Sequence, residues 1–204
     1  IKVIRYIFSI NPGRSGSAYL SKLFNCVEGV ASFHEPFPIF NGAVMREYLK
    51  GNDSPLRQQI TARLTFIENI LKDHEVYFES NHCFIKGFGW ILAENFKQEE
   101  MAVIVLSRDK DKVKNSLFKV NAHPFTTTGE KWIIVPHSYK GNIVPYPVGI
   151  SRLQYYAYFI TYRFFNKLGK FTNIEVPEFI VKYCKELVAW YIAESYALGL
   201  RYRS

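Results

Sequence analysis

The chain has 204 residues, and its hydrophobic share of 48%, with 17% aromatic residues, suffices for one hydrophobic core and excludes a disordered protein. Its formal net charge of +8 favours anionic partners, such as nucleotides, acidic glycans, nucleic acids or membrane surfaces. The three cysteines are too few for a disulfide framework, no His/Cys cluster is typical of zinc, and no apolar run reaches the length of about 18 residues that spans a bilayer. We therefore expect a single domain over residues 1–204 in the cytoplasm, with no metal site and no transmembrane segment. Because the chain starts at Ile1, a lumenal fragment is the alternative.

In chain order, the first predicted strand is residues 2–10, where Val, Ile, Tyr and Phe dominate. A loop with one Pro and two Gly follows, and the next predicted element is a helix over residues 18–25. Several Pro residues interrupt residues 32–42, which is typical of a loop, here after a short strand. A helix is then predicted over residues 56–73. It places four apolar residues on one face: Ile60, Leu64, Ile67 and Leu71.

The middle of the chain contains a second strongly apolar run, residues 101–107 (MAVIVLS), which is typical of a buried strand in a parallel sheet. A short strand over residues 76–79 and a helix over residues 88–96 are predicted before it. Residues 109–120 alternate charged and apolar residues at helical spacing. Three basic residues of this helix are expected to form a solvated face: Lys110, Lys112 and Lys114.

The C-terminal part is predicted to hold a loop-rich segment, residues 126–148, and two long aromatic helices over residues 150–168 and 177–198. The aromatic run at residues 155–165 (YYAYFITYRFF) covers several faces of the first helix, so we expect most of it to lie in the core. The second helix places six residues on one face: Ile180, Tyr183, Cys184, Leu187, Val188 and Tyr191.

Strands that alternate with helices predict an α/β fold, a P-loop-like three-layer domain with a central parallel sheet flanked by helices. Ligands bind such sheets beyond the carboxyl ends of the strands. The loop at residues 11–18 and the turn at Arg108 both follow predicted strands. The sequence therefore predicts that these two segments bind the ligand.

The loop NPGRSGSA has the layout of a phosphate-binding loop but departs from a Walker A motif. Aligned on Gly16, it has Asn11 in place of the first Gly. Ser17 stands in place of the Lys, and Ala18 in place of the hydroxyl residue that holds magnesium. Backbone N–H groups and a helix N-terminus can still bind an anion, with Arg14 as the cation. This pattern favours metal-free transfer of an anionic group over triphosphate hydrolysis; the alternative is an ordinary Gly-rich turn with Arg14 at the surface.

The stretch NPGRSGSAYL resembles the phosphosulfate-binding loop of the sulfotransferases that use PAPS, 3′-phosphoadenosine 5′-phosphosulfate. In that family a Lys or Arg, a Ser, a Gly and hydroxyl residues follow a strand and open a helix. Ala18 departs from the pattern, because a hydroxyl residue is common at its position. The resemblance implies that consecutive loop residues hold the phosphosulfate: Gly13, Arg14, Ser15, Gly16, Ser17 and Ala18.

The family's second signature is a strand that ends in Arg, followed by a helix with a Ser eight residues on. The stretch VIVLSRDKDKVKNSLFKV has Arg108 and Ser116 at this spacing. The resemblance implies that both residues bind the 3′-phosphate, for which the planar fork of an Arg is well suited. Taken alone, Arg108 is equally suited to an ion pair with Asp109 or Asp111.

The segments FHEPFPIF and YFESNHCFIKGF resemble carbohydrate-type and bacterial members of the family, and the whole resemblance covers residues 1 to about 120. In such members an acidic residue serves as general base, which implies this role for Glu35; a salt bridge or a helix cap is the alternative. His82 is the second candidate for the base or a substrate contact, and otherwise a structural residue. If a strand continues through His34 and Glu35, their side chains face opposite ways.

The resemblance implies a metal-independent sulfotransferase that moves a sulfuryl group in line from PAPS to a hydroxyl or amine of a small-molecule or carbohydrate acceptor, and that releases PAP, the desulfated product. Arg14 is the residue expected to stabilise the charge on the leaving phosphate. The missing Lys and magnesium ligand disfavour a small-molecule kinase, and the lack of a recognisable motif disfavours a nucleic-acid-binding module. A non-catalytic or degenerate P-loop protein that binds an anionic ligand is the remaining alternative.

Overall fold

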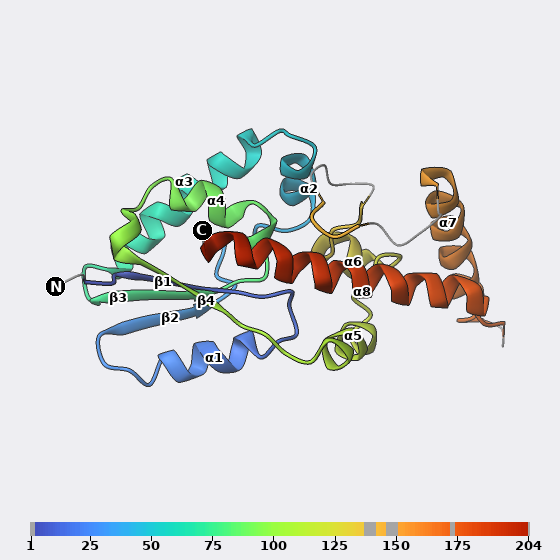
Figure 1. The fold of residues 1–204 in the computed structure, drawn as a ribbon, viewed down its shortest axis with the longest axis horizontal. Coiled ribbons are helices and arrows are strands. Elements are labelled where there is room, and N and C mark those ends of the chain that lie inside the picture. The colour runs from blue at the N-terminus through green and yellow to red at the C-terminus, as the bar shows by residue number, and fades with distance from the viewer. Residues whose placement is uncertain (1–2, 137–141, 146–150, 172–173, 204) are drawn as a thin grey trace.

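The computed structural model describes residues 3–136, 142–145, 151–171 and 174–203, and a parallel β-sheet forms its centre (Figure 1). Across the sheet the strands follow the order β2-β3-β1-β4. Their bounds are β1 (Tyr6–Ile10), β2 (Val30–His34), β3 (Val76–Ser80) and β4 (Met101–Val105). Helices cover both faces of this sheet, so the predicted three-layer α/β fold is confirmed.

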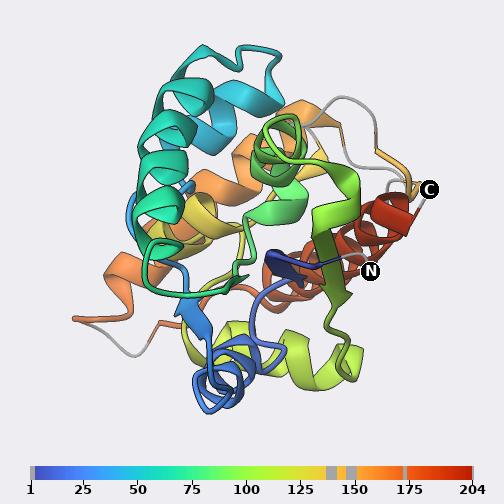
Figure 2. The same ribbon diagram turned by 90° about the vertical axis from the view of Figure 1, so that its left-hand side faces the viewer.

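Two pairs of helices form the outer layers. Helices α1 (Ser17–Phe24) and α5 (Lys110–Lys119) lie on one face of the sheet, and α3 (Ser54–Ile70) and α4 (Phe88–Ala93) lie on the other, as the end view in Figure 2 shows. These four helices confirm the helices predicted over residues 18–25, 109–120, 56–73 and 88–96. The predicted apolar face of α3 lies inward, with Ile60 and Ile67 buried in the core.

Strand β1 pairs with β4, and β2 with β3, over their full lengths. Strand β1 lies between β3 and β4, and its first paired residue, Tyr6, faces Tyr77 and Met101 in register. The strand predicted over residues 2–10 is therefore shorter at its start, and residue 2 lies outside the described residues. The central position of β1 explains its apolar sequence, since Phe8 and Ile10 are completely buried.

Two short helices were not predicted, α2 (Ala43–Leu49) and α6 (Thr127–Trp132). Helix α6 lies inside the segment predicted to be loop-rich, of which residues 137–141 and 146–148 are outside the described residues. Thr126 caps it by accepting a hydrogen bond from the Gly129 N–H at 3.0 Å. A Cβ at Gly129 would lie 1.8 Å from the carbonyl oxygen of His123, so only glycine fits this close approach. A local cap and a close backbone approach, rather than apolar periodicity, thus accompany this helix.

The two long C-terminal helices are present as α7 (Arg152–Leu168) and α8 (Glu178–Leu200), with residue 150 outside the described residues. Helix α8 runs from beside the sheet to the far end of the molecule, where α7 packs on it (Figure 1). Its predicted apolar face is confirmed, because all of its residues are buried: Ile180, Tyr183, Cys184, Leu187, Val188 and Tyr191. Among the described helices, none combines the length and the hydropathy that crossing a bilayer requires.

The prediction that the aromatic run of α7 lies mostly in the core is wrong. Tyr155 is the one buried residue of this helix. Tyr155 packs with Phe125 against the first turns of α8, whereas Ile160 is 66% and Phe164 is 60% exposed. Tyr158, Phe159 and Tyr162 are half-buried against the same cluster, so the helix contacts the rest of the protein through one face and the apolar residues of the opposite face are exposed.

A buried ionic network joins α3 to β3 and to the segment that follows β2. The Arg63 side chain is fully buried, forms an ion pair with Glu79, and donates hydrogen bonds to the carbonyl oxygens of Pro36 and Pro38. The Tyr77 hydroxyl also donates to the Glu79 carboxylate, at 2.7 Å. The network therefore fixes the segment that follows Glu35 and the end of β3 that precedes His82.

Candidate anion-binding site

The predicted site residues lie together at one edge of the sheet, beyond the carboxyl ends of the strands. The loop at residues 11–16 follows β1, Glu35 follows β2, His82 follows β3 by two residues, and Arg108 follows β4. Because all the strand pairs are parallel, these four segments reach the same edge.

Left-handed backbone conformations shape the loop after β1. The φ angles are 84° at Gly13, 59° at Arg14 and 94° at Gly16, and α1 begins directly after Gly16. The Asn11 side chain accepts a hydrogen bond from the Gly13 N–H at 2.9 Å, and the Tyr191 hydroxyl of α8 donates to the Pro12 carbonyl at 2.7 Å. These contacts hold the loop in one conformation.

The backbone N–H groups of this loop are available to a ligand. Within the described part of the chain, the N–H groups of residues 14–18 have no hydrogen-bond acceptor. Ser15 and Ser17 are buried, and their hydroxyls bind protein groups, Ser15 Oγ donating to the Gly13 carbonyl at 3.3 Å. Ala18 is exposed in the first turn of α1. Such a loop, followed by a helix N-terminus, attracts an anion through its N–H groups.

Two guanidinium groups converge on the loop from different segments. Arg14 Nε donates to the hydroxyl of Ser116, on α5, at 3.1 Å. Arg108 Nη1 donates to the carbonyl oxygen of Arg14 at 2.9 Å. The Tyr196 hydroxyl of α8 lies between the N–H and the carbonyl of Arg108, at 3.0 and 3.1 Å. The structure thus brings together the two halves of the predicted motif, which lie about 90 residues apart in the sequence.

Neither arginine has a carboxylate partner among the described residues. The alternative ion pair of Arg108 with Asp109 or Asp111 is absent, because Asp109 caps α5 through the Lys112 N–H and Asp111 pairs with Lys114. Two exposed cations held side by side repel each other, and a bound anion would remove that repulsion.

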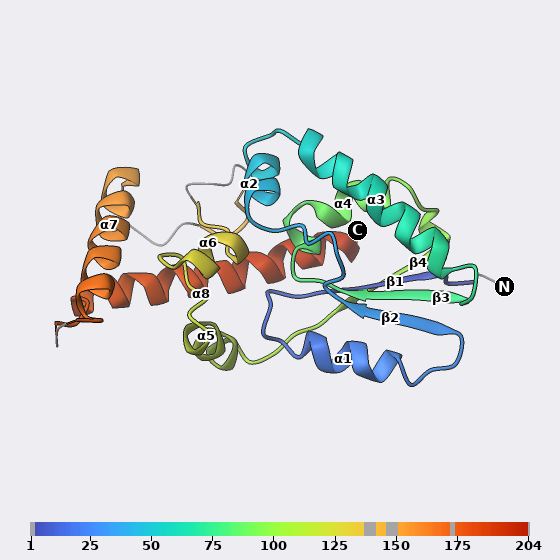
Figure 3. The same cartoon turned by 180° about the vertical axis from the view of Figure 1, so that it is seen from behind.

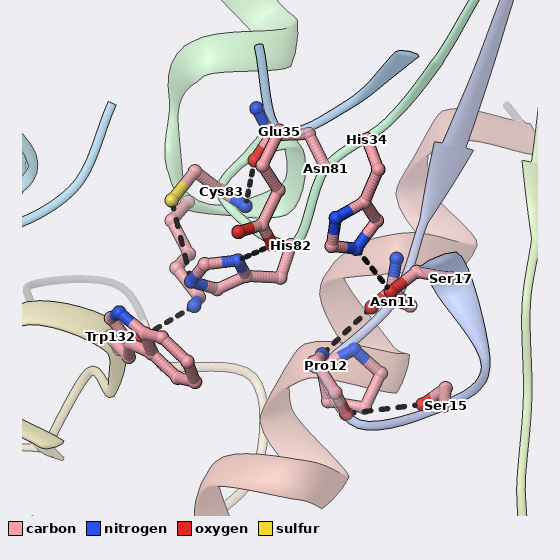
Figure 4. A network of polar contacts seen from close by, with 12 residues as sticks. Asn11, Pro12, Ser15, Ser17, His34, Glu35, Asn81, His82, Cys83 and Trp132 are labelled. Carbon is pink, nitrogen blue, oxygen red and sulfur yellow. Dashed lines mark hydrogen bonds and ion pairs between the residues drawn. The ribbon is translucent and has the colours of Figure 1, made fainter. Parts of the chain in front are cut away.

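The second cluster is a carboxylate–imidazole pair. Glu35 Oε1 lies 2.5 Å from His82 Nδ1, and the two side chains are 22% and 3% exposed (Figure 4). Glu35 has a φ angle of 49°, and its N–H donates to the Ser80 carbonyl at 3.0 Å. His82 packs on the loop, since a Cβ at Gly13 would lie 3.8 Å from His82 Cβ. The pair therefore sits directly against the anion-binding loop.

Ionisation of this pair follows from its burial and its mutual contact. Burial opposes ionisation of Glu35, but the hydrogen bond and the charge of His82 outweigh it and lower the pKa of Glu35 to about 2. Burial disfavours the His82 imidazolium as well, yet the Cys83 sulfur and the Glu35 carboxylate raise the pKa of His82 to about 9. The two side chains form an ion pair at neutral pH.

Strand β2 ends at His34, so the condition under which the His34 and Glu35 side chains would face opposite ways, a strand through both residues, is not met. Figure 4 shows the His34 side chain reaching toward Ser17 and the Glu35 side chain reaching toward His82. His34 Nε2 and Ser17 Oγ lie 3.0 Å apart. The left-handed conformation at Glu35 turns the chain and makes this arrangement possible.

Residues that the sequence did not single out complete the site. Lys86 is buried, its Nζ donates to the Trp132 carbonyl at 2.5 Å, and burial lowers its pKa to about 8. It lines a cavity of about 400 Å³ together with Tyr48, Trp90 and Leu198. Lys86 connects this cavity with the Glu35–His82 pair, because its charge acts electrostatically on Glu35. No local pattern in the sequence marks these residues, since they come to the cavity from separate helices and loops.

The Glu35–His82 pair is expected to give the free energy of unfolding a defined pH dependence. The contribution of Glu35 is present above pH 4.5 and is lost as the pH falls toward about 2, because folding lowers its pKa. The contribution of His82 is complete below pH 6.5 and is lost as the pH rises through about 9, because folding raises its pKa. Urea unfolding of wild type should therefore show a loss of about 1.5–3 kcal/mol on the alkaline side. That loss should disappear in His82→Gln and persist in the exposed control His74→Gln; an equal loss in all three proteins would contradict the ion pair.

No protein-family model, curated protein or solved structure matches the chain. The described residues contain no group of three His, Cys, Asp or Glu side chains that could hold a metal ion.

Proposed function

We propose that the protein is a sulfotransferase that moves a sulfuryl group from PAPS to a hydroxyl or amine acceptor, in line and without a metal. One observation carries the proposal: two guanidinium groups, Arg14 and Arg108, meet at the loop after β1. Within the described part of the chain, neither group has a carboxylate partner and the loop N–H groups have no acceptor. This arrangement suits a ligand with more than one anionic group, and PAPS has two, a phosphosulfate and a 3′-phosphate. The motif resemblance adds support from the same residues.

The residues of the site fit this ligand. Arg14 and the loop N–H groups would hold the phosphosulfate, and Arg108 with Ser116 would hold the 3′-phosphate. When bound, PAPS supplies the activated sulfuryl group. A magnesium–triphosphate complex fits less well, because the Walker Lys is replaced by Ser17 and the Walker hydroxyl residue by Ala18.

Sulfuryl transfer requires a positive charge near the leaving phosphate and a base that accepts the acceptor's proton, and the chain has a group for each. Arg14 places a positive charge at the loop, where charge develops on the leaving phosphate oxygen. Glu35 accepts the proton of the acceptor hydroxyl through Oε2, which has no partner among the described residues, while Oε1 binds His82. A carboxylate of low pKa suffices, because an acceptor oxygen becomes acidic as its bond to sulfur forms. His82 acts by orienting Glu35 and keeping it ionised.

The cavity next to Lys86 is the proposed entry for the acceptor. Its wall combines the aromatic rings of Tyr48 and Trp90 with charged side chains, among them Lys50 and Asp53. Aromatic faces next to polar groups suit a sugar or another small alcohol. The proposed acceptor is therefore a small-molecule or carbohydrate hydroxyl rather than a macromolecular surface.

Calorimetric titration with PAP tests the proposal. PAP is expected to bind without metal, and Arg108→Ala should weaken it about 10- to 100-fold, because the variant loses a hydrogen bond between charged groups. Adenosine 5′-phosphate lacks the 3′-phosphate, so its affinity should not change in this variant. Arg5→Ala is the matched control, since Arg5 is exposed before the amino end of β1, at the opposite edge of the sheet. Binding of ATP that requires magnesium, or binding of neither nucleotide, would contradict the proposal.

A further inference from the structure

Helix α7 carries an apolar face that no described part of the protein covers. The helix lies at the end of α8 farthest from the sheet, as Figures 1 and 3 show. Its inner face packs on α8, whereas its outer face is exposed at positions three or four residues apart. This α7 outer face consists of Leu153 (80% exposed), Tyr156 (46%), Ile160 (66%) and Phe164 (60%).

Positive charge borders the α7 outer face. Between Glu130 and Glu175 the sequence has six Lys or Arg residues and no Asp or Glu. By helical spacing, Arg152, Arg163 and Lys167 follow one flank of the outer face, and all three are exposed. Among the described residues, this helix forms one ion pair, between Arg163 and Glu130 at 2.6 Å. The helix therefore has two apolar faces, an inner one that packs on α8 and an outer one that is exposed to solvent. Basic residues border the outer face.

We propose that α7 is an interfacial helix that lies on an anionic lipid bilayer, with its outer face among the acyl chains. Exposed aromatic and aliphatic side chains flanked by Arg and Lys are what such a helix requires, because the apolar residues leave water while the basic residues meet the lipid phosphates. At 17 residues the helix is long enough to lie along the surface but is not a membrane-spanning segment. This inference is independent of the proposed function.

Charge complementarity distinguishes a lipid surface from the other possible occupants. A second copy that met this face around a two-fold axis would bring the same basic side chains together, with few acidic groups nearby to offset them. A nucleic acid would match the charge but would leave the four apolar side chains of the outer face in water. An anionic bilayer would remove the apolar side chains from water and would also place lipid phosphates next to the basic residues.

Flotation with lipid vesicles tests the inference. The protein should bind vesicles of equal parts phosphatidylglycerol and phosphatidylcholine, should bind vesicles of phosphatidylcholine alone much less, and should be released as salt screens the charges. Ile160→Glu combined with Phe164→Glu should reduce binding about tenfold or more. Leu23→Glu is the matched control, because Leu23 is an exposed leucine on α1, 47% accessible and far from α7, and it should leave binding unchanged.

The variants should unfold at the same temperature as wild type, because the substituted side chains are exposed. Absence of vesicle binding, or binding that the double variant retains, would overturn the inference. So would a dimer in sedimentation analysis that the double variant abolishes, since a second copy would then be the occupant. Vesicle binding by a chain that does not bind PAP would contradict the proposed function and leave this inference intact.

Discussion

Glu35→Gln is expected to slow sulfuryl transfer about 10²- to 10⁴-fold, the range that a general base contributes. The substitution keeps the shape of the side chain and leaves an amide oxygen that can accept a hydrogen bond from His82 Nδ1. In wild type this nitrogen lies 2.5 Å from the carboxylate. It removes the negative charge that would accept the acceptor's proton. The rate would be measured as transfer of labelled sulfate from PAPS to the best substrate in a panel of sugars, phenols and amines.

Two comparisons separate a role in proton transfer from a structural role of Glu35. PAP affinity should be unchanged in Glu35→Gln, because the loop and the two arginines do not contact its carboxylate in the described hydrogen bonds. Glu94→Gln, an exposed glutamate that pairs with Arg57, should leave both the rate and the affinity unchanged. If transfer survives in Glu35→Gln at the wild-type rate, Glu35 is not the base; if PAP binding falls in parallel with the rate, its role is to shape the site.

Arg63→Met is expected to lower the free energy of unfolding by about 3–5 kcal/mol, because it leaves the buried Glu79 carboxylate without its cationic partner. The side chain of Arg63 is fully buried and also binds the carbonyl oxygens of Pro36 and Pro38. Its loss therefore frees the segment that follows Glu35 as well as destabilising the core. Urea unfolding of the two proteins measures the difference.

Arg57→Met provides the matched control for Arg63→Met, since both residues lie on α3 and both form ion pairs. The Arg57 side chain is 48% exposed, so removing its contacts with Asp53 and Glu94 should change the free energy of unfolding by less than about 1 kcal/mol. Adding Glu79→Gln to Arg63→Met should restore part of the loss, because the buried charge is then neutral. Equal losses in Arg63→Met and Arg57→Met would contradict the role assigned to the buried network.

Local patterns were enough to predict most of the secondary structure. Three strands and six helices follow from apolar runs and helical spacing, and the Gly-rich loop with Arg14 follows from its place between a strand and a helix. The spacing of Arg108 and Ser116 was equally visible, because it lies within one strand–helix unit. Parallel strands that alternate with helices also imply that all these segments meet at one sheet edge.

Contacts between distant segments were decided by the tertiary structure. Glu35 and His82 are 47 residues apart, and they meet because β2 and β3 are neighbours in the sheet, an order that no local pattern encodes. The same holds for Tyr191 and Tyr196 of α8, whose hydroxyls hold the Pro12 and Arg108 segments. The sequence also could not show which face of α7 is covered, since an aromatic helix has the same periodicity whether it is packed on one side or on two. Spacing along a chain determines which residues share a face; what lies against that face depends on where the other elements pack.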